Sequence, residues 1–394
     1  MAALTEHLII CFGLMKSCIG AGIYSYPHTF NLYGVVWTTI LTVLTCAASI
    51  FGTYVYIDRN KALQKEHSIS TLGAAVVSKN FKYFVDIVVI LKCLVVAAGY
   101  LNLAKNLIQK ISPDADNGIL TVDPSVSGFL FTGLGCLLLT PSILSSKLGK
   151  LKNLSYIGTL SIILIIALSK IESAGKPLNF EMFTSSPPSI IQNIGLFVFG
   201  FSCHQSIMTI HNESIIPETR LKFLIMLSFV CVSCLYLGFG FINYSAFSVI
   251  NGSPANLEQI FLAWEEKHLV TKLATILFAS SLVITVPFQI HPAKSYFIDM
   301  FNVSDGYKRL VGISMIVLCY FLTTQSWYNF YFVSNFVAKP LNSLLCFGFP
   351  VLFTIYGRFK KSCSDYMICI YLAIFTLACF ASYFVSLYKL LTKV

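Results

Sequence analysis

The chain has 394 residues, of which 56% are hydrophobic and 11% charged, with a formal net charge of +10. Soluble domains carry about 25% charged residues, so this composition excludes a water-soluble protein. The charges fall mainly in short segments between apolar runs, which argues against a nucleic-acid partner. A membrane-spanning helix needs roughly 20 mostly apolar residues, and runs of that length recur along the chain. We therefore predict an all-α, multi-pass integral membrane protein.

The apolar runs predict eleven membrane-spanning helices. The first run continues without a cleavage site, so we interpret it as a helix and not as a secretory signal. In chain order the predicted spans are 7–33, 35–57, 83–109, 126–144, 154–171, 190–212, 221–246, 270–291, 308–326, 337–357 and 365–388.

The distribution of basic residues predicts the topology. With the N-terminus in the cytoplasm, most Lys and Arg residues outside the spans fall in inner loops, as the positive-inside rule expects. The C-terminus then lies outside, where Lys389 and Lys393 are exceptions to the rule. Asn251, in an outer Asn-Gly-Ser sequence, is a candidate glycosylation site.

Two predicted spans are interrupted near mid-depth. The first contains Ile19-Gly20-Ala21-Gly22, and the sixth contains Gly200 followed by the polar run Ser202–Ser206. Backbone groups freed in hydrocarbon cost several kcal/mol unless protein or a wet cavity satisfies them. Breaks at corresponding positions of two halves therefore indicate a central site between inverted repeats. The alternative is that the glycines only allow close helix packing. The repeats would be 1–171 and 190–357, with 365–394 as an additional helix.

The sequences around these breaks resemble the amino acid/auxin permease family. KSCIGAGIYSYPHTFNLYG, which begins at Lys16, resembles the family's first helix. FSCHQSIMTIHNESIIPET, which begins at Phe201, resembles its Phe-x-Cys-His run, and VDIVVILKC, ITVPFQIHPAK and LCFGFPVLFTIYGR resemble segments of helices 3, 8 and 10. The resemblance implies the leucine-transporter-type 5+5 inverted-repeat fold and amino-acid transport coupled to sodium or protons. The outer loops lack the cysteines that several relatives use for a disulfide.

The predicted substrate site is built from both breaks. The N–H groups at the start of a half-helix carry partial positive charge, and glycine lets a ligand approach the backbone closely. The first break would therefore bind the substrate carboxylate, and carbonyl groups of the second would bind its ammonium. Tyr100 is predicted to close over the substrate, with core packing as the alternative. The predicted residues are Ser17, Cys18, Ile19, Gly20, Ala21, Gly22, Tyr100, Phe199, Gly200, Phe201, Ser202 and Cys203.

Lys16 is the most informative charge for ion coupling. Sodium-coupled relatives tend to place Asn at this position, whereas several proton-coupled relatives carry Lys. An ammonium group beside the break can do the electrostatic task of a bound sodium ion; the alternative is a lysine that extends to the cytoplasmic surface. In this fold hydroxyls of the eighth helix usually complete a sodium site, which points to Ser280, Ser281 and Thr285. Alternatively, these hydroxyls bond to their own helix.

Other ionisable residues leave two interpretations open. His204, beside the second break, titrates near neutral pH and is either a proton carrier or a neutral residue of the site. Glu213 is either a cytoplasmic gate paired with a basic residue or a solvated side chain. Asp86 and Lys92 lie within an apolar run, where an ionisable residue indicates function by default.

We predict a secondary active transporter of amino acids that works by alternating access and is proton-coupled or uncoupled. The alternatives are a sodium-coupled neutral amino-acid transporter and a non-transporting amino-acid sensor; an acyltransferase or a passive channel has less support. The predicted partners are an amino acid, a proton or sodium ion and membrane lipid, with no cofactor, no metal site and no enzymatic activity. The expected location is the plasma membrane or the vacuolar or lysosomal membrane.

Overall fold

The computed structural model is almost entirely helical. The residues it describes are 2–63, 67–111, 123–144, 151–184, 190–250, 253–254, 260–264, 269–325, 339–357 and 362–392. Within them, seven helical segments are long and apolar enough to cross a bilayer. The prediction of a multi-pass membrane protein is confirmed. The total of eleven spans stays a prediction, because the other predicted spans are described only as helical pieces too short to cross a bilayer alone.

The first span is broken where the sequence predicts. Helix α1 (Ala2–Cys18) ends before Ile19 and Gly20, and the 3-10 helix η1 (Ala21–Ser25) then continues into α2 (Tyr26–Ala62). Gly20 has φ −118° and ψ −132°, which interrupts the helical hydrogen-bond ladder. The first span therefore consists of two half-helices joined by a short extended link.

Helix α2 bends at Gly34, between the first and second predicted spans. Gly34 has φ +74°, a conformation that glycine adopts without steric cost. The N–H groups of Val35 and Val36 donate to the carbonyls of Glu181 and Met182, both at 3.1 Å. A loop between later helices thus binds the backbone freed at this bend.

The sixth span is also broken. Helix α7 (Ile190–Gly200) ends at the predicted glycine, residues 201–203 are not helical, and η4 (His204–Ser206) leads into α8 (Ile207–Glu213). Both predicted interruptions are therefore present as breaks in the backbone.

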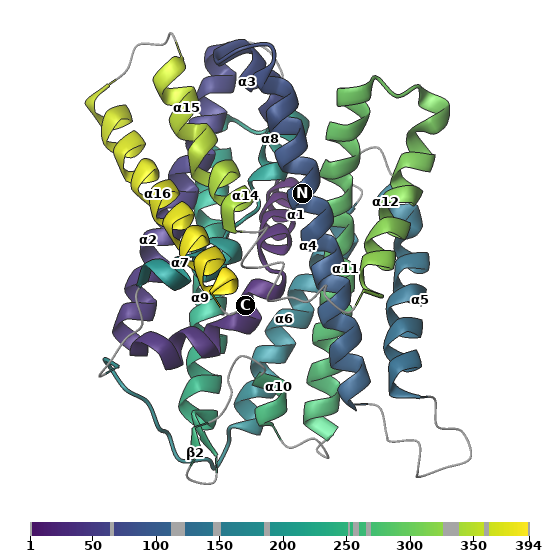
Figure 1. Cartoon of the computed structure of the whole chain (residues 1–394), viewed down its shortest axis with the longest axis vertical. Coiled ribbons are helices and arrows are strands. Elements are labelled where there is room, and N and C mark those ends of the chain that lie inside the picture. Colours follow the sequence, from purple (N-terminus) through teal and green to yellow (C-terminus); the bar gives the residue numbers. More distant parts are fainter. Residues whose placement is uncertain are drawn as a thin grey trace.

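The remaining elements complete a bundle in which α4 and α11 lie side by side (Figure 1). At one end, β1 and β2 form a short antiparallel hairpin. The bounds are α3 Ile69–Val76, α4 Phe81–Ile111, α5 Pro124–Leu144, α6 Lys152–Glu172, α9 Glu218–Phe247, β1 Val249–Ile250, β2 Ser253–Pro254, α10 Ile260–Ala263, α11 Leu269–Phe301, η6 Asp305–Tyr307, α12 Lys308–Leu322, α14 Lys339–Ser343, the π-helix η8 Leu344–Gly348, α15 Phe349–Tyr356 and α16 Cys363–Leu391.

Residues 58–82, which lie between the predicted spans 35–57 and 83–109 and would form an inner loop, are largely helical. They contain the last turn of α2 and the separate helix α3, whose first N–H groups are capped by Ser68. The Ser68 hydroxyl accepts from Thr71 N–H and the Thr71 hydroxyl accepts from Ser68 N–H, a capping box. A helix this short falls below the length that apolar periodicity detects. Asn251, the predicted glycosylation site, lies outside the described residues.

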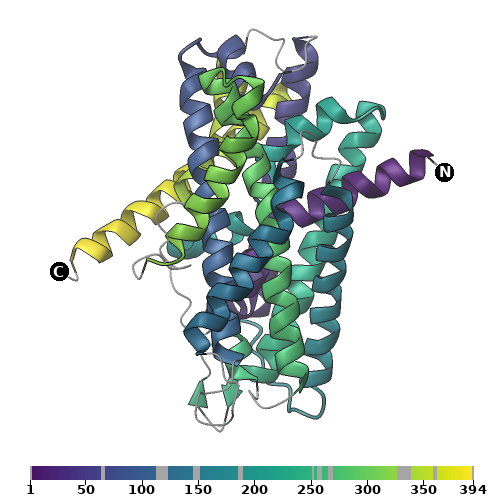
Figure 2. The same cartoon turned by 90° about the vertical axis from the view of Figure 1, so that its right-hand side faces the viewer.

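The ends of the chain project from the bundle in opposite directions. Figure 2 shows α1 leaving on one side and α16 on the other. The inner part of α1 contacts α6, α9 and α11, so the end of this helix nearest the break is held by the bundle. Lys16 lies in this part.

Candidate substrate and ion site

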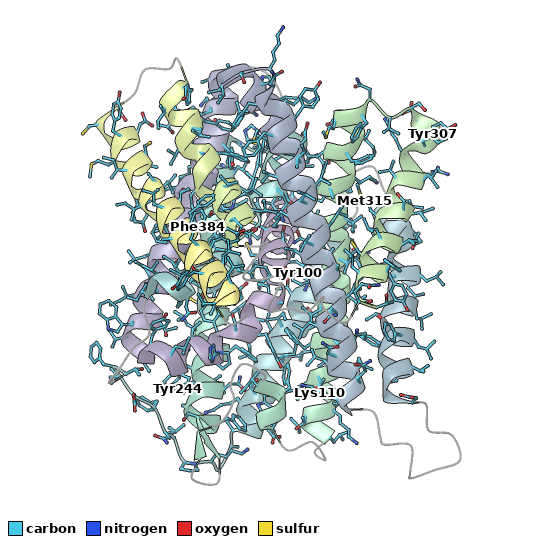
Figure 3. The ribbon with its side chains drawn as sticks, in the orientation of Figure 1. Tyr100, Lys110, Tyr244, Tyr307, Met315 and Phe384 are labelled. Atoms are coloured by element: carbon cyan, nitrogen blue, oxygen red, sulfur yellow. The ribbon has the colours of Figure 1, made fainter. Side chains whose placement is uncertain are left out.

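The two helix breaks meet at a pair of glycines. A Cβ atom added to Gly22 would lie 2.8 Å from the Cα of Gly200, which is closer than real Cβ contacts. A Cβ atom on Gly20 would overlap with the hydroxyl group of Tyr100. Tyr100 projects from α4 near the middle of the bundle, whereas Lys110 lies toward one end of the same helix (Figure 3). The structure therefore brings together the predicted residues Gly20, Gly22, Gly200 and Tyr100.

Tyr236 of α9 joins the two breaks. Its hydroxyl oxygen lies 2.8 Å from the carbonyl oxygen of Gly200 and 3.1 Å from that of Cys18. A hydroxyl has a single hydrogen, so it donates to one carbonyl at a time. Tyr236 is absent from the predicted residues; the signal for it was a hydroxyl-bearing side chain inside the apolar run 223–241.

Fewer backbone N–H groups are available at the first break than predicted. Ile19 N–H donates to Met15 O at 2.7 Å, and Gly20 N–H donates to Cys18 O at 3.0 Å. The N–H groups of Ala21 and Gly22 lie in the first turn of the next helical segment, where no intrahelical acceptor exists. The predicted carboxylate ligands are thus reduced to these two groups. Ser17 is buried, and its hydroxyl has no partner among the described residues.

The second break carries neutral polar contacts. The Ser202 hydroxyl donates to Asn342 Oδ1 at 2.8 Å. His204 Nε2 lies 3.0 Å from the carbonyl oxygen of Ser49; because a carbonyl only accepts, Nε2 carries the hydrogen. His204 Nδ1 is buried without a partner in the described structure. The remaining predicted residues of this break, Phe199, Phe201 and Cys203, are also buried.

Lys16 is fully buried, and its ammonium group bonds to α11. Nζ lies 2.7 Å from Ser281 Oγ, 3.0 Å from Ser281 O and 3.4 Å from Ile19 O. Its aliphatic stem lies over Gly158 of α6, where an added Cβ would overlap with it. This geometry excludes the alternative in which Lys16 extends to the cytoplasmic surface.

The three predicted hydroxyls of α11 differ in their contacts. Ser281 Oγ accepts from Lys16, whereas the Thr285 hydroxyl donates to Ser281 O at 2.7 Å within its own helix. Ser280 is half-buried and is not brought to Lys16. One hydroxyl of the three therefore faces the Lys16 ammonium group.

Cavities of unequal size lie on either side of the breaks. A cavity of about 120 Å³ between α1, α6, α8 and α11 is lined by Glu6, Lys152 and Glu213, among others. Glu213 is exposed at the end of α8. A space of about 20 Å³ toward the hairpin end is lined by Tyr24, Phe261, Thr271 and other residues.

Aromatic rings close the hairpin end. Tyr24 stacks on Phe278 with ring centroids 5.5 Å apart, and Phe261 lies 5.7 Å from Tyr24 and 5.1 Å from Trp264. Trp264 Nε1 donates to Asn243 Oδ1 at 3.0 Å, which fixes the indole ring. The larger of the two cavities therefore lies at the end predicted to be cytoplasmic, whereas the hairpin end is filled by aromatic rings.

Nearly the whole chain matches the sequence model of one protein family. The sequence model described as "Transmembrane amino acid transporter protein" matches residues 7–392. The chain belongs to this family. The resemblance to amino acid/auxin permeases is confirmed, and the family is one of multi-pass membrane transporters without enzymatic activity.

Two relatives resemble this chain at low sequence identity. "Vacuolar amino acid transporter 5" of Schizosaccharomyces pombe is 23% identical over 326 residues, which cover 79% of this chain and 74% of that protein. "Solute carrier family 38 member 8" of Mus musculus is 20% identical over 307 residues, which cover 74% and 68%.

A solved structure shows the fold of this family member. MhsT in complex with L-phenylalanine aligns with a TM-score of 0.62 at 13% identity, covering 96% of this chain and 98% of that one. The predicted leucine-transporter-type fold is confirmed. The number of spans and the repeat boundaries 1–171 and 190–357 stay predictions.

Proposed function

We propose that this protein is a secondary active transporter that moves amino acids by alternating access. The observation that carries the proposal is the meeting of the two helix breaks at Gly22 and Gly200, where the Tyr236 hydroxyl lies within hydrogen-bond distance of one carbonyl oxygen from each break. Breaks in lipid are tolerated only where protein or a cavity satisfies the freed backbone. Membership of the family and the names of its relatives support an amino acid as substrate.

Both charged groups of an amino acid find complementary groups at the breaks. The N–H groups of Ala21 and Gly22 would donate to the carboxylate. The carbonyls of Cys18 and Gly200 would accept from the ammonium group, since each carbonyl oxygen has two lone pairs. Tyr100 would cover the substrate from α4. These backbone contacts recognise the carboxylate and ammonium groups that all amino acids share. They require no charged side chain from the protein.

The unequal packing of the two ends of the bundle supports alternating access. The larger cavity lies toward the predicted cytoplasmic end, and stacked aromatic rings close the hairpin end. A carrier in one of its states is expected to be closed on one side and more open on the other. Movement of the aromatic cluster Tyr24–Phe261–Phe278 would then open the opposite side.

Lys16 supports proton-coupled or ion-independent transport. Its ammonium group contacts one carbonyl of the first break and two oxygens of α11, a set of acceptors suited to a cation. A sodium ion at this position would lie close to a fixed positive charge. Even at an effective dielectric of about 20, two unit charges roughly 4 Å apart repel by about 4 kcal/mol. Sodium would therefore bind poorly beside Lys16.

Exchange across liposomes tests the carrier function. We expect purified protein to accelerate entry of a labelled amino acid when the liposomes are preloaded with the same unlabelled amino acid. A channel would show no such acceleration, and a non-transporting sensor would bind the amino acid without uptake. Either result, obtained with protein shown to be folded, would contradict the proposal.

A further inference from the structure

A column of polar side chains on α11 continues beyond the Lys16 contact. Ser281, Thr285 and Gln289 recur every four residues and therefore share one face of the helix. Gln289 Oε1 accepts from Lys92 Nζ of α4 at 3.2 Å and from Gln205 Nε2 at 3.3 Å. All of these side chains are at most 1% exposed. Lys92, Gln205 and Gln289 thus form a buried polar triad.

The hydrogen bonding of this triad is incomplete. Gln205 Oε1 and Gln289 Nε2 are buried without a partner in the described structure. The Lys92 ammonium group has three donors, and the hydrogen bond to Gln289 is the one described for it. The triad therefore presents more unused donors than acceptors.

No described carboxylate neutralises Lys92. None of the ion pairs among the described residues includes it. Asp86, the one acidic residue of α4, precedes Lys92 by six residues, a rise of about 9 Å along the helix. The polar and charged side chains near Asp86 include Ser70, Lys82, Tyr296 and Asp299.

The position of the triad relates it to the substrate. Gln205 follows Ser202 of the second break by three residues, and Lys92 precedes Tyr100 by two helical turns. Gln289 follows Thr285 by one turn, a rise of about 6 Å. The triad thus lies about one helical turn beyond the second break, and the proposal below requires the side chain of a substrate held at Gly22 and Gly200 to extend toward it.

A carboxylate matches the unused donors. A buried ammonium group is costly unless it is paired, and a carboxylate would accept short, charge-assisted bonds from Lys92 and Gln289. An apolar side chain would leave the ammonium unpaired, which makes the triad selective. An inorganic anion such as chloride could also accept hydrogen bonds from Lys92 and Gln289.

We propose that Lys92 and Gln289 bind the side-chain carboxylate of the substrate, with Gln205 positioning Gln289, and that the protein carries dicarboxylic amino acids. This inference rests on the proposed transport function. Lys92 supplies the charge, Gln289 a second donor, and Gln205 holds the Gln289 side chain by its amide.

Competition and substitution in liposomes test the proposal. We expect labelled glutamate to be taken up, aspartate to compete, and leucine to compete at least about tenfold more weakly. Lys92→Met removes the charge but keeps an unbranched side chain, and it should lower the ratio of glutamate to glutamine uptake by at least about tenfold. Lys105→Met is the matched control, because Lys105 lies on the same helix but donates to Thr323 O at 2.6 Å. It should leave the ratio unchanged.

The other outcomes separate the two proposals. Uptake of leucine but not glutamate by the wild type would overturn the dicarboxylate proposal and leave the transporter intact, whereas uptake of no amino acid would overturn the transport function itself. An equal loss of glutamate and glutamine uptake in folded Lys92→Met would also overturn the dicarboxylate proposal. Loss of uptake when gluconate replaces chloride would do the same, because it would assign the triad to chloride. If Lys92→Met does not fold, a larger rise in wild-type Tm with leucine than with glutamate is the contradicting result.

Discussion

Two lysines are buried against the same face of α11, but their ammonium groups are bonded differently. Lys16 has three acceptors within 3.4 Å, all from the protein. Lys92 has one described acceptor, the side chain of Gln289. A satisfied buried charge can serve as a permanent part of the site, whereas an unsatisfied one is costly until a ligand pairs with it. The comparison separates a built-in cation from a charge that selects substrate.

The comparison assumes that the substrate lies at the breaks. Gly22→Leu should abolish uptake of every amino acid, because its side chain would collide with the backbone of Gly200. Liposome uptake and Tm are to be measured together. Gly238→Leu is the control, since a Cβ there meets nothing within 4 Å. Normal affinity and uptake in folded Gly22→Leu would remove the first break from the site.

Loss of the built-in cation should affect all substrates alike. Lys16→Ala leaves Ser281 and the Ile19 carbonyl without their charged donor, and such bonds are worth about 1.5–3 kcal/mol. Uptake should fall by about a hundredfold at the upper end of that range. Unchanged uptake would show that Lys16 has no part in transport.

Lys16→Asn sharpens the same contrast. An amide side chain restores neutral oxygen ligands beside Ser281 and removes the positive charge. Uptake by this variant should therefore become stimulated by sodium, which is measured as the ratio of uptake in sodium to uptake in choline. A ratio equal to that of the wild type would argue against competition between lysine and sodium.

Adjacent serines of α11 provide a matched pair. Ser281→Ala removes one acceptor of Lys16 and should lower uptake by about tenfold, the value of one bond to a charged group. Ser280→Ala removes a hydroxyl that does not contact Lys16 and should leave uptake within about twofold of wild type. Equal effects of the two substitutions in initial-rate measurements would show that Ser281 acts only through packing.

Of the substitutions at the site itself, Tyr236→Phe should have the smallest effect. It removes one hydroxyl that bonds to Gly200 O or Cys18 O, and a neutral hydrogen bond contributes about 0.5–1.5 kcal/mol. We expect KM to rise by about threefold, equally for glutamate and glutamine, because the ring remains. A change in selectivity between them would place Tyr236 near the substrate side chain instead.

Local sequence features were sufficient to predict most of the fold. Long apolar runs mark the spans, and Gly20, Gly22 and Gly200 mark breaks because few other residues allow them. Lys16 and Ser281 were also found, since a charge or hydroxyl at mid-depth is conspicuous. The helix α3 was missed because eight residues are too few for a periodic signal.

Contacts between distant helices could not be predicted. Tyr236 reaches both breaks, and Gln289 meets Lys92 and Gln205, only because of how α4, η4, α9 and α11 are oriented relative to one another. One turn along a helix separates Thr285, bonded to its own backbone, from Gln289, bonded to two other elements. The spacing of residues along a helix shows which side chains share a face, but it does not show which other helix that face contacts.

The central claim is that the Lys16 ammonium group takes the place of a sodium ion. Its most direct test is initial-rate uptake by wild-type protein in liposomes, with sodium fully replaced by choline, at several external pH values. We predict that uptake persists without sodium, either unchanged by pH or stimulated by an inward proton gradient. Strict dependence on sodium would contradict the account and would assign Ser281 and Thr285 to a sodium site.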